Sequence, residues 1–172
     1  MSLNSIKFET TDIARLFKNS LVDIDTDKKY IVETKGPTQE EDTGWKFLGE
    51  NNKKILIAVR YPDVVFLPDK HLSFLTKLLA ACNLNPGDVA IINFQHYSSN
   101  DFEKIVNYFK PKIVLLLDIR PSEFGMPMNF PEFQVQAYKD AVYVSSPSLE
   151  TIEPDKILKG KLWVCLKKIF NL

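Results

Sequence analysis

The sequence predicts an α/β protein, a three-layer α/β/α sandwich around a mainly parallel, four-stranded central sheet. Short apolar runs rich in branched residues are typical of strands covered on both faces, and the chain has four of them, at residues 55–59, 89–92, 113–117 and 142–144. Amphipathic helical patterns separate most of these runs. Strands that alternate with helices through short connections build a parallel sheet with helices on both faces.

Three helices are expected from the spacing of apolar side chains. The first opens at Pro68-Asp69, stops within 83–87 and carries Leu72, Leu75, Leu78, Leu79 and Cys82 on one side. The second is capped by Asn100-Asp101, ends at Pro111 and carries the stripe Phe102, Ile105, Val106 and Phe109. The third starts at Pro154, and its apolar face consists of Leu158, Leu162, Cys165, Leu166 and Ile169.

The first 52 residues have a different pattern, and we expect them to form an N-terminal segment packed on, or extending from, a core at 53–172. Within this segment the pattern indicates a short helix after Thr11-Asp12, strands at 28–35 and around 45–48, and a polar loop between these strands. The segment has a net charge of −3 and the remainder +3, so the charges cancel in the 172-residue chain. A neutral chain argues against binding driven by bulk electrostatics.

Composition also limits the cofactors and the compartment. Two cysteines are too few for a disulfide framework or a four-thiolate metal site, and with six glycines the chain has no phosphate-binding loop. No apolar run approaches the length of a membrane span, and no export signal is recognised at the N-terminus. We therefore expect a cytoplasmic protein with reduced thiols, no nucleotide cofactor and no metal.

Chemistry in a parallel α/β sheet is expected beyond the carboxyl ends of the strands. In this chain those ends are residues 60–63, 93–96, 118–120 and 145–148. His96 is either an acid or base in the crevice or a surface loop residue, and Asp118 is either catalytic or engaged in a local ion pair with Arg120 or a helix cap. His71 is expected to be solvated, and both cysteines are expected to be buried packing residues. The last helix carries basic residues that either meet phosphates or form a solvated face, namely Lys156, Lys159, Lys161, Lys167 and Lys168.

The order of several segments resembles the uracil-DNA glycosylases of the bacterial and archaeal thermophile type. The resemblance spans about residues 53–170, and its motifs lie at 78–84, 89–93, 108–117, 145–149 and 158–167. Asn93 matches the asparagine that reads the uracil edge in that family, although it could equally cap the loop after its strand. The resemblance implies a uracil-DNA glycosylase-like fold for the core.

The residues that would carry base excision differ from the family pattern. Where the family has a Gly-Glu-(Ala)-Pro-Gly motif with a water-activating acid, this chain has Val59, Arg60, Tyr61, Pro62 and Asp63. Ser146 stands at the position of the catalytic histidine, followed by the matching Pro147. A glycosylase must accept a flipped base and stabilise the leaving anion. Bulky Arg60 and Tyr61 would fill that pocket, so we expect no catalysis and a vestigial pocket.

A non-catalytic relative of this fold, the psi subunit of bacterial DNA polymerase III, is similar over the segments 55–59, 72–84, 85–88 and 145–149. This resemblance implies a protein–protein adaptor in DNA replication that joins the clamp loader to a further partner. It also implies that an N-terminal segment docks on the clamp loader. In this chain the candidate residues are Phe8, Ile13, Leu16 and Phe17. The alternative is a DNA-interacting, glycosylase-like protein of base excision or damage recognition; for an adaptor, DNA binding is expected to be weak.

Overall fold

The computed structural model describes residues 44–172, which cluster as one unit. Several expectations for the N-terminal segment therefore lie outside the described residues. These are the short helix after Thr11-Asp12, the strand at 28–35, most of the polar loop, and the partner-binding candidates Phe8, Ile13, Leu16 and Phe17. The expected boundary at residue 52 stays a prediction, although residues 48–49 pair with the sheet of the core.

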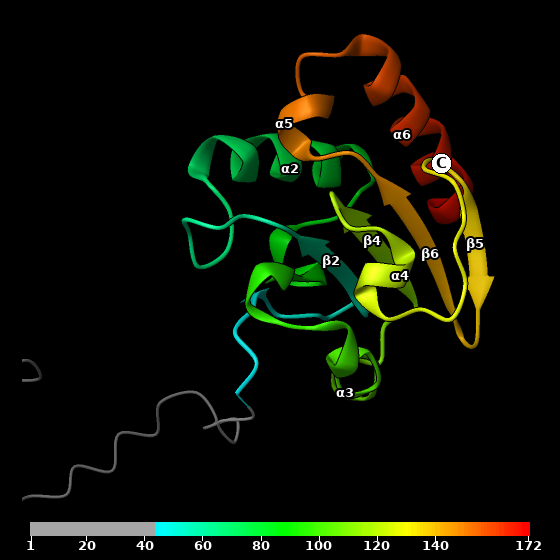
Figure 1. The fold of residues 1–172 in the computed structure, drawn as a ribbon. Helices are drawn as coiled ribbons and strands as arrows, with labels where there is room; N and C mark the ends of the chain where they lie inside the picture. Colours follow the sequence, from blue (N-terminus) through cyan, green and yellow to red (C-terminus); the bar gives the residue numbers. More distant parts are fainter. Residues whose placement is uncertain (1–43) are drawn as a thin grey trace, which may run out of the picture. The chain divides into compact units, whose positions relative to one another are not determined.

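The protein is an α/β protein with a mixed six-stranded sheet in the order β1-β3-β2-β4-β6-β5 (Figure 1). Its strands are β1 (Leu48–Gly49), β2 (Ile55–Val59), β3 (Val89–Asn93), β4 (Ile113–Leu117), β5 (Val135–Tyr138) and β6 (Ala141–Ser146). β3, β2, β4 and β6 run parallel, with Ile55 opposite both Val89 and Ile113. β1 and β5 pair antiparallel at the two edges.

All four apolar runs form strands of this one sheet, as the sequence predicts. The expected sheet of four strands is nevertheless too small, because it lacks the two edge strands. β1 has only two residues, and β5 reads Val-Gln-Ala-Tyr, which is too polar for a strand covered on both faces. β5 is held instead as one arm of a hairpin with β6, in which Tyr138 lies opposite Ala141.

Three longer helices follow the expected segments. α2 (Asp69–Ala81) begins after Pro68, and α6 (Lys156–Phe170) begins after Asp155, whose Oδ1 accepts hydrogen bonds from the backbone of residues 157 and 158. α3 (Phe102–Phe109) starts differently from the expectation. Its cap is a short 3₁₀ turn at residues 99–101, in which Ser98 and Asp101 bond each other 3.1 Å apart. The two single-turn helices α4 (Pro121–Phe124) and α5 (Leu149–Ile152) were not predicted.

Side chains of the central strands alternate between two hydrophobic clusters, one on each face of the sheet. On β2, Ile55, Ile57 and Val59 join the cluster that contains residues of α2, α5 and α6. Leu56 and Ala58 join the other cluster, which contains residues of α3 and α4. Helices therefore cover both faces of the sheet. The connection from β2 to β3 runs through α2 on one face, and the connection from β3 to β4 runs through α3 on the other.

The chain reverses its direction across the sheet beside β2. The connection through α2 places β3 on one side of β2, and the next connection, through α3, places β4 on the other side. The gap between the carboxyl ends of β2 and β4 is thus a topological switch point, the place where open α/β sheets leave a crevice.

Candidate ligand crevice at the carboxyl edge of the sheet

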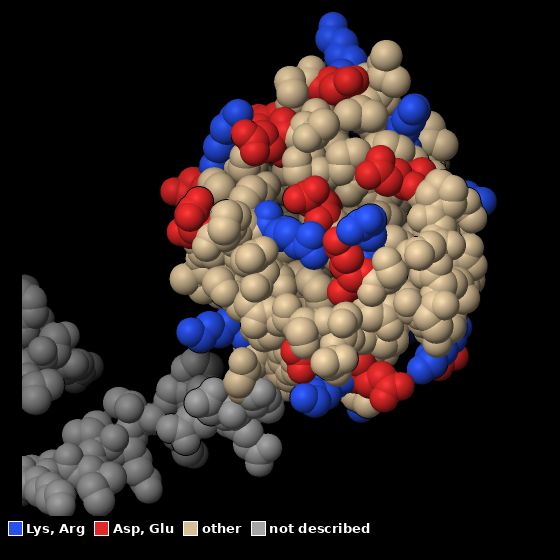
Figure 2. Space-filling model, in the orientation of Figure 1, with Lys and Arg blue, Asp and Glu red and all other residues tan. Residues whose placement is uncertain are grey.

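A hollow of about 490 Å³ lies at this switch point. Its lining comes from the segments that follow β2 and β4 and from the end of β6, and it consists of Arg60, Asp118, Ile119, Arg120, Pro121, Glu123, Phe130, Pro131, Glu132, Ser145 and Ser146. Figure 2 shows basic and acidic side chains next to one another around a hollow near the centre of this face. We call this site the carboxyl-edge crevice.

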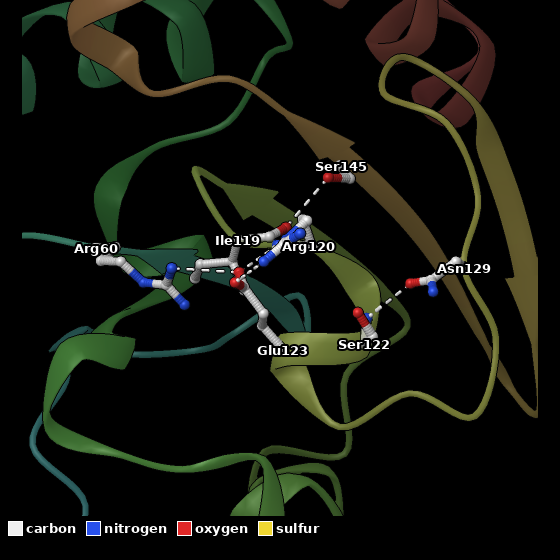
Figure 3. A network of polar contacts seen from close by, with 7 residues as sticks. All are labelled: Arg60, Ile119, Arg120, Ser122, Glu123, Asn129 and Ser145. Carbon is white, nitrogen blue, oxygen red and sulfur yellow. Dashed lines mark hydrogen bonds and ion pairs between the residues drawn. The ribbon is translucent and has the colours of Figure 1, made fainter.

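Three of the five charged groups of the crevice are bound to one another, namely Arg60, Arg120 and Glu123. Glu123 accepts from Arg120 at 2.6 Å through Oε1 and from Arg60 at 3.2 Å through Oε2 (Figure 3). The same Oε2 also accepts the backbone N–H of Arg120, which closes the first turn of α4. These contacts hold the pKa of the Glu123 carboxyl at about 2, chiefly through the hydrogen bonds from Arg120.

The net charge of the crevice is slightly negative because of two further acids. Arg60 and Arg120 stand against Asp118, Glu123 and Glu132, which leaves a formal charge of −1. Both guanidinium groups are already engaged by the Glu123 carboxylate. An anionic ligand would compete with that carboxylate for the guanidinium groups and would meet a lining of net negative charge, so the crevice is poorly suited to phosphate.

The serine hydroxyls at the end of β6 are turned to the backbone. Ser145 Oγ donates to the Ile119 carbonyl at 3.1 Å, and Ser146 Oγ donates to the Pro147 carbonyl at 3.3 Å. Neither hydroxyl bonds a histidine in the part of the chain that the structure describes. The arrangement needed to activate a serine nucleophile is therefore not assembled there.

Asn93 is the residue whose sequence position left two roles open, and its amide is fully occupied by the protein. Nδ2 donates to the carbonyls of Tyr61 at 2.7 Å and Val64 at 2.8 Å, while Oδ1 accepts from the backbone N–H groups of Tyr61 and Gln95. The side chain is 1% exposed. Asn93 thus caps the turn after β3 and ties it to the loop after β2, so the amide edge that would read a base is taken.

The other residues expected around a filled pocket are dispersed. Arg60 and Ser146 line the crevice, whereas Tyr61 and Pro147 are half-buried and do not line it. Pro62 and Asp63 are exposed in the loop after β2. Because Asn93 faces that loop, the matched positions do not converge on one cavity.

Tyr61 packs against a histidine that we expected to be solvated. The rings of Tyr61 and His71 stack with centroids 5.7 Å apart, and His71 is only 7% exposed. Burial, together with nearby Glu150, Asp118 and Glu153, raises the pKa of Tyr61 to about 12. His71 is the third residue of α2, where α2 packs against the segment around Glu153, and Nδ1 lies 3.5 Å from Glu153 Oε2 without a hydrogen bond. The expectation for His71 is wrong because α5, which covers this end of α2, was not predicted.

Other expected site residues have simpler positions. His96 is exposed at the turn after β3, with Nε2 3.4 Å from the Val64 carbonyl. Cys82 and Cys165 are buried, as predicted, and burial raises the pKa of each thiol. In residues 44–172 no group of His, Cys, Asp and Glu side chains has the arrangement of a metal site. The same residues contain no helix with the length and apolar character needed to span a membrane.

Sequence reasoning missed Glu123, the residue that organises the crevice. A signal was present, since Arg120-Pro121-Ser122-Glu123 has proline at the first helical position and glutamate two residues later, typical of a helix start. Glu132 and Phe130 had no comparable signal, because the irregular segment between α4 and β5 brings them to the crevice.

Comparisons with known proteins add no assignment. Neither a scan against protein-family models nor a search of curated proteins finds a match for this chain.

Proposed function

We propose that this protein is a non-catalytic member of the uracil-DNA glycosylase-like fold that acts as a protein–protein adaptor in DNA replication, similar to the psi subunit of DNA polymerase III. The proposal that the protein is non-catalytic rests chiefly on the hydrogen bonds of the Asn93 side chain. Its four amide hydrogen bonds go to the backbone, so no donor or acceptor remains for a flipped base.

The carboxyl-edge crevice supports the same proposal. A glycosylase needs a group that stabilises the negative charge of the departing base. Ser146 supplies no positive charge, and the nearby Arg60 is paired with Glu123. A crevice whose two arginines are both bound to Glu123 has no free cation among its described residues to stabilise a departing anion, which favours a role in the fold over one in a reaction.

A direct experiment tests the adaptor role. The full chain is mixed with the purified clamp-loader complex of its own source organism, and complex formation is followed by size-exclusion chromatography and calorimetry. We expect a stoichiometric complex that Leu16→Glu with Phe17→Glu abolishes and Lys7→Gln leaves intact. Failure of the unchanged chain to associate would contradict the adaptor role in replication.

A second assay tests the non-catalytic part by itself. The protein is incubated with single- and double-stranded DNA that contains uracil, and abasic sites are counted against a heat-inactivated control. We expect no release of uracil above the control. Enzyme-dependent abasic sites would instead favour the alternative, a glycosylase-like protein of base excision.

A further inference from the structure

A second hollow, of about 430 Å³, lies at the opposite ends of the parallel strands, where β4 and β6 begin. Its basic residues are Lys54, Lys110, Lys112 and Lys139, and its other lining residues are Val106, Asn107, Pro111, Asp140, Ala141 and Tyr143. With Asp140 as the one acid in this lining, the formal charge is +3. We call this site the lysine groove.

Backbone hydrogen bonds fix the lysines of the groove relative to one another. The N–H of Lys112 donates to the Lys54 carbonyl at 2.7 Å, and the N–H of Val142 donates to the Lys112 carbonyl at 2.9 Å. The N–H of Lys110 donates to the Val106 carbonyl in the last turn of α3. The lysines therefore project from a preorganised edge of the sheet, which lowers the entropy cost of binding a partner.

Three of the four lysines occupy left-handed backbone conformations. The φ angles are +58° at Lys54, +44° at Lys110 and +50° at Lys139. Glycine or asparagine adopts this conformation most easily, and other residues adopt it at a cost. Backbone preference thus does not account for lysine at these positions.

None of the four lysines of the groove makes an ion pair within residues 44–172, a state that they share with most of the described lysines. Lys53, Lys70 and Lys104 each lie within 3.3 Å of a carboxylate oxygen. Within residues 44–172, no carboxylate lies at ion-pair distance from any lysine of the groove, and Lys139 Nζ lies 5.6 Å from the ring centroid of Tyr138. Four cations that are unpaired in the described part of the chain, beside a single acid of the lining, favour an acidic partner.

We propose that the lysine groove binds an acidic peptide segment of a partner protein, one that also carries an apolar side chain. The acidic groups would meet the lysines, and the apolar side chain would lie against half-buried Val106, beside the buried Pro111 and Ala141. This inference rests on the groove alone and holds whether or not the partner belongs to the replication machinery.

The floor of the groove favours a peptide over a nucleic acid. Single-stranded nucleic acids are held by stacking bases on exposed aromatic rings, whereas Tyr143 is only 1% exposed. The groove also lacks arginine, whose planar fork recognises phosphate in two-point fashion. An apolar floor would remain unused under a phosphodiester backbone.

The test measures fluorescence anisotropy with the full chain and three labelled probes. These are a decapeptide of Glu and Leu, a decapeptide of Lys and Leu, and a single-stranded oligothymidine of similar length. The groove variant combines Lys54→Asn, Lys110→Asn and Lys139→Asn, because asparagine removes the charge and tolerates the left-handed backbone. The control variant combines Lys77→Gln, Lys156→Gln and Lys167→Gln, which removes equal charge from exposed positions on α2 and α6.

We expect the Glu–Leu peptide to bind with a Kd below roughly 100 µM and the Lys–Leu peptide not to bind. The groove variant is expected to weaken binding at least about tenfold, while the control variant changes it less than about threefold. The proposal is overturned if the Glu–Leu peptide does not bind, if both variants weaken it equally, or if oligothymidine binds more tightly than the peptide. Circular dichroism of both variants establishes that a loss of binding does not reflect unfolding.

Discussion

The two ends of the parallel strands carry charged hollows of similar size that differ in how their charged side chains are paired. At the carboxyl-edge crevice, Glu123 bonds both Arg60 and Arg120, and the formal charge is −1. At the lysine groove the formal charge is +3, and no described carboxylate pairs with its lysines. At the carboxyl ends of the strands, where α/β folds usually bind ligands, both arginines are already paired with Glu123, whereas the lysines at the opposite ends are not paired within the described residues.

This difference teaches that position in a fold does not by itself identify a binding site. A charged residue that is already hydrogen-bonded inside the protein must lose those bonds before it can hold a ligand. An unpaired lysine on a fixed backbone gives up only water and freedom of its side chain. The bonding state of each group therefore locates the binding surface better than the strand ends do.

The largest change in stability is expected when the Asn93 side-chain amide, which links the loop after β2 to the turn after β3, is removed. Asn93→Ala leaves the carbonyls of Tyr61 and Val64 and the N–H of Tyr61 without their partner. Because such buried groups lose their hydrogen bonds, we expect the free energy of unfolding to fall by about 3 kcal/mol, measured by urea denaturation. Asn100→Ala, at an exposed position, is the control and should change it by less than about 0.5 kcal/mol. A small effect at Asn93 would mean that the amide is free for another role.

A smaller effect is expected when the carboxylate between the two arginines is neutralised. Glu123→Gln should lower the free energy of unfolding by about 1 kcal/mol at pH 7, since the lost contacts are partly solvent-exposed. The folded protein holds the pKa of Glu123 at about 2, below the ordinary value of 4.5. The contribution is therefore fully present above about pH 4.5 and is lost as the pH falls towards 2.

The pH dependence is checked by thermal unfolding of both proteins between pH 7 and pH 2. The difference in Tm between the unchanged chain and Glu123→Gln should shrink over the acid part of this range. Glu103→Gln, at an exposed position of α3, controls for the loss of one carboxylate. A difference in Tm that stays constant down to pH 2 would show that the carboxylate contributes nothing through its charge.

The smallest effect is expected at the lysine groove, and its sign is opposite. Lys110→Asn relieves a left-handed conformation that lysine adopts at a cost, so the free energy of unfolding should rise by about 0.5 kcal/mol. Urea denaturation of Lys110→Asn beside Lys112→Asn measures this effect, since Lys112 has no positive φ. Lower stability in Lys110→Asn would indicate that its ammonium group stabilises the fold instead of serving a partner.

The central strands and longer helices could be predicted because each has a strong pattern of its own. Ile55–Val59 and Ile113–Leu117 are continuous apolar runs, and α3 carries apolar side chains at helical spacing. β5 and α5 were missed, and the strand expected around 45–48 is only the two-residue β1 at 48–49, because these short elements depend on pairing or packing with distant segments. The burial of His71 could not be predicted for the same reason, since the covering α5 follows it by almost eighty residues.

The candidate sites divide in a similar way. The sequence indicated the carboxyl edge, including Arg60, Asp118 and Ser146, because strand ends can be read from apolar runs. It did not indicate the lysine groove, because Lys54, Lys110 and Lys139 come from three separate turns, and each alone is an ordinary surface residue. Their common φ sign and lack of ion pairs are visible only in three dimensions.

The most direct test of the account is to map where an acidic, apolar peptide contacts the protein. Two-dimensional ¹⁵N–¹H NMR of the full chain is recorded while the Glu–Leu decapeptide is added. We predict that the largest shift changes fall on the backbone amides of residues 54, 106–110, 112 and 139–143, around the lysine groove. Shift changes concentrated instead at residues 60, 118–120, 122–123 and 145–146 would place binding in the carboxyl-edge crevice and contradict the account.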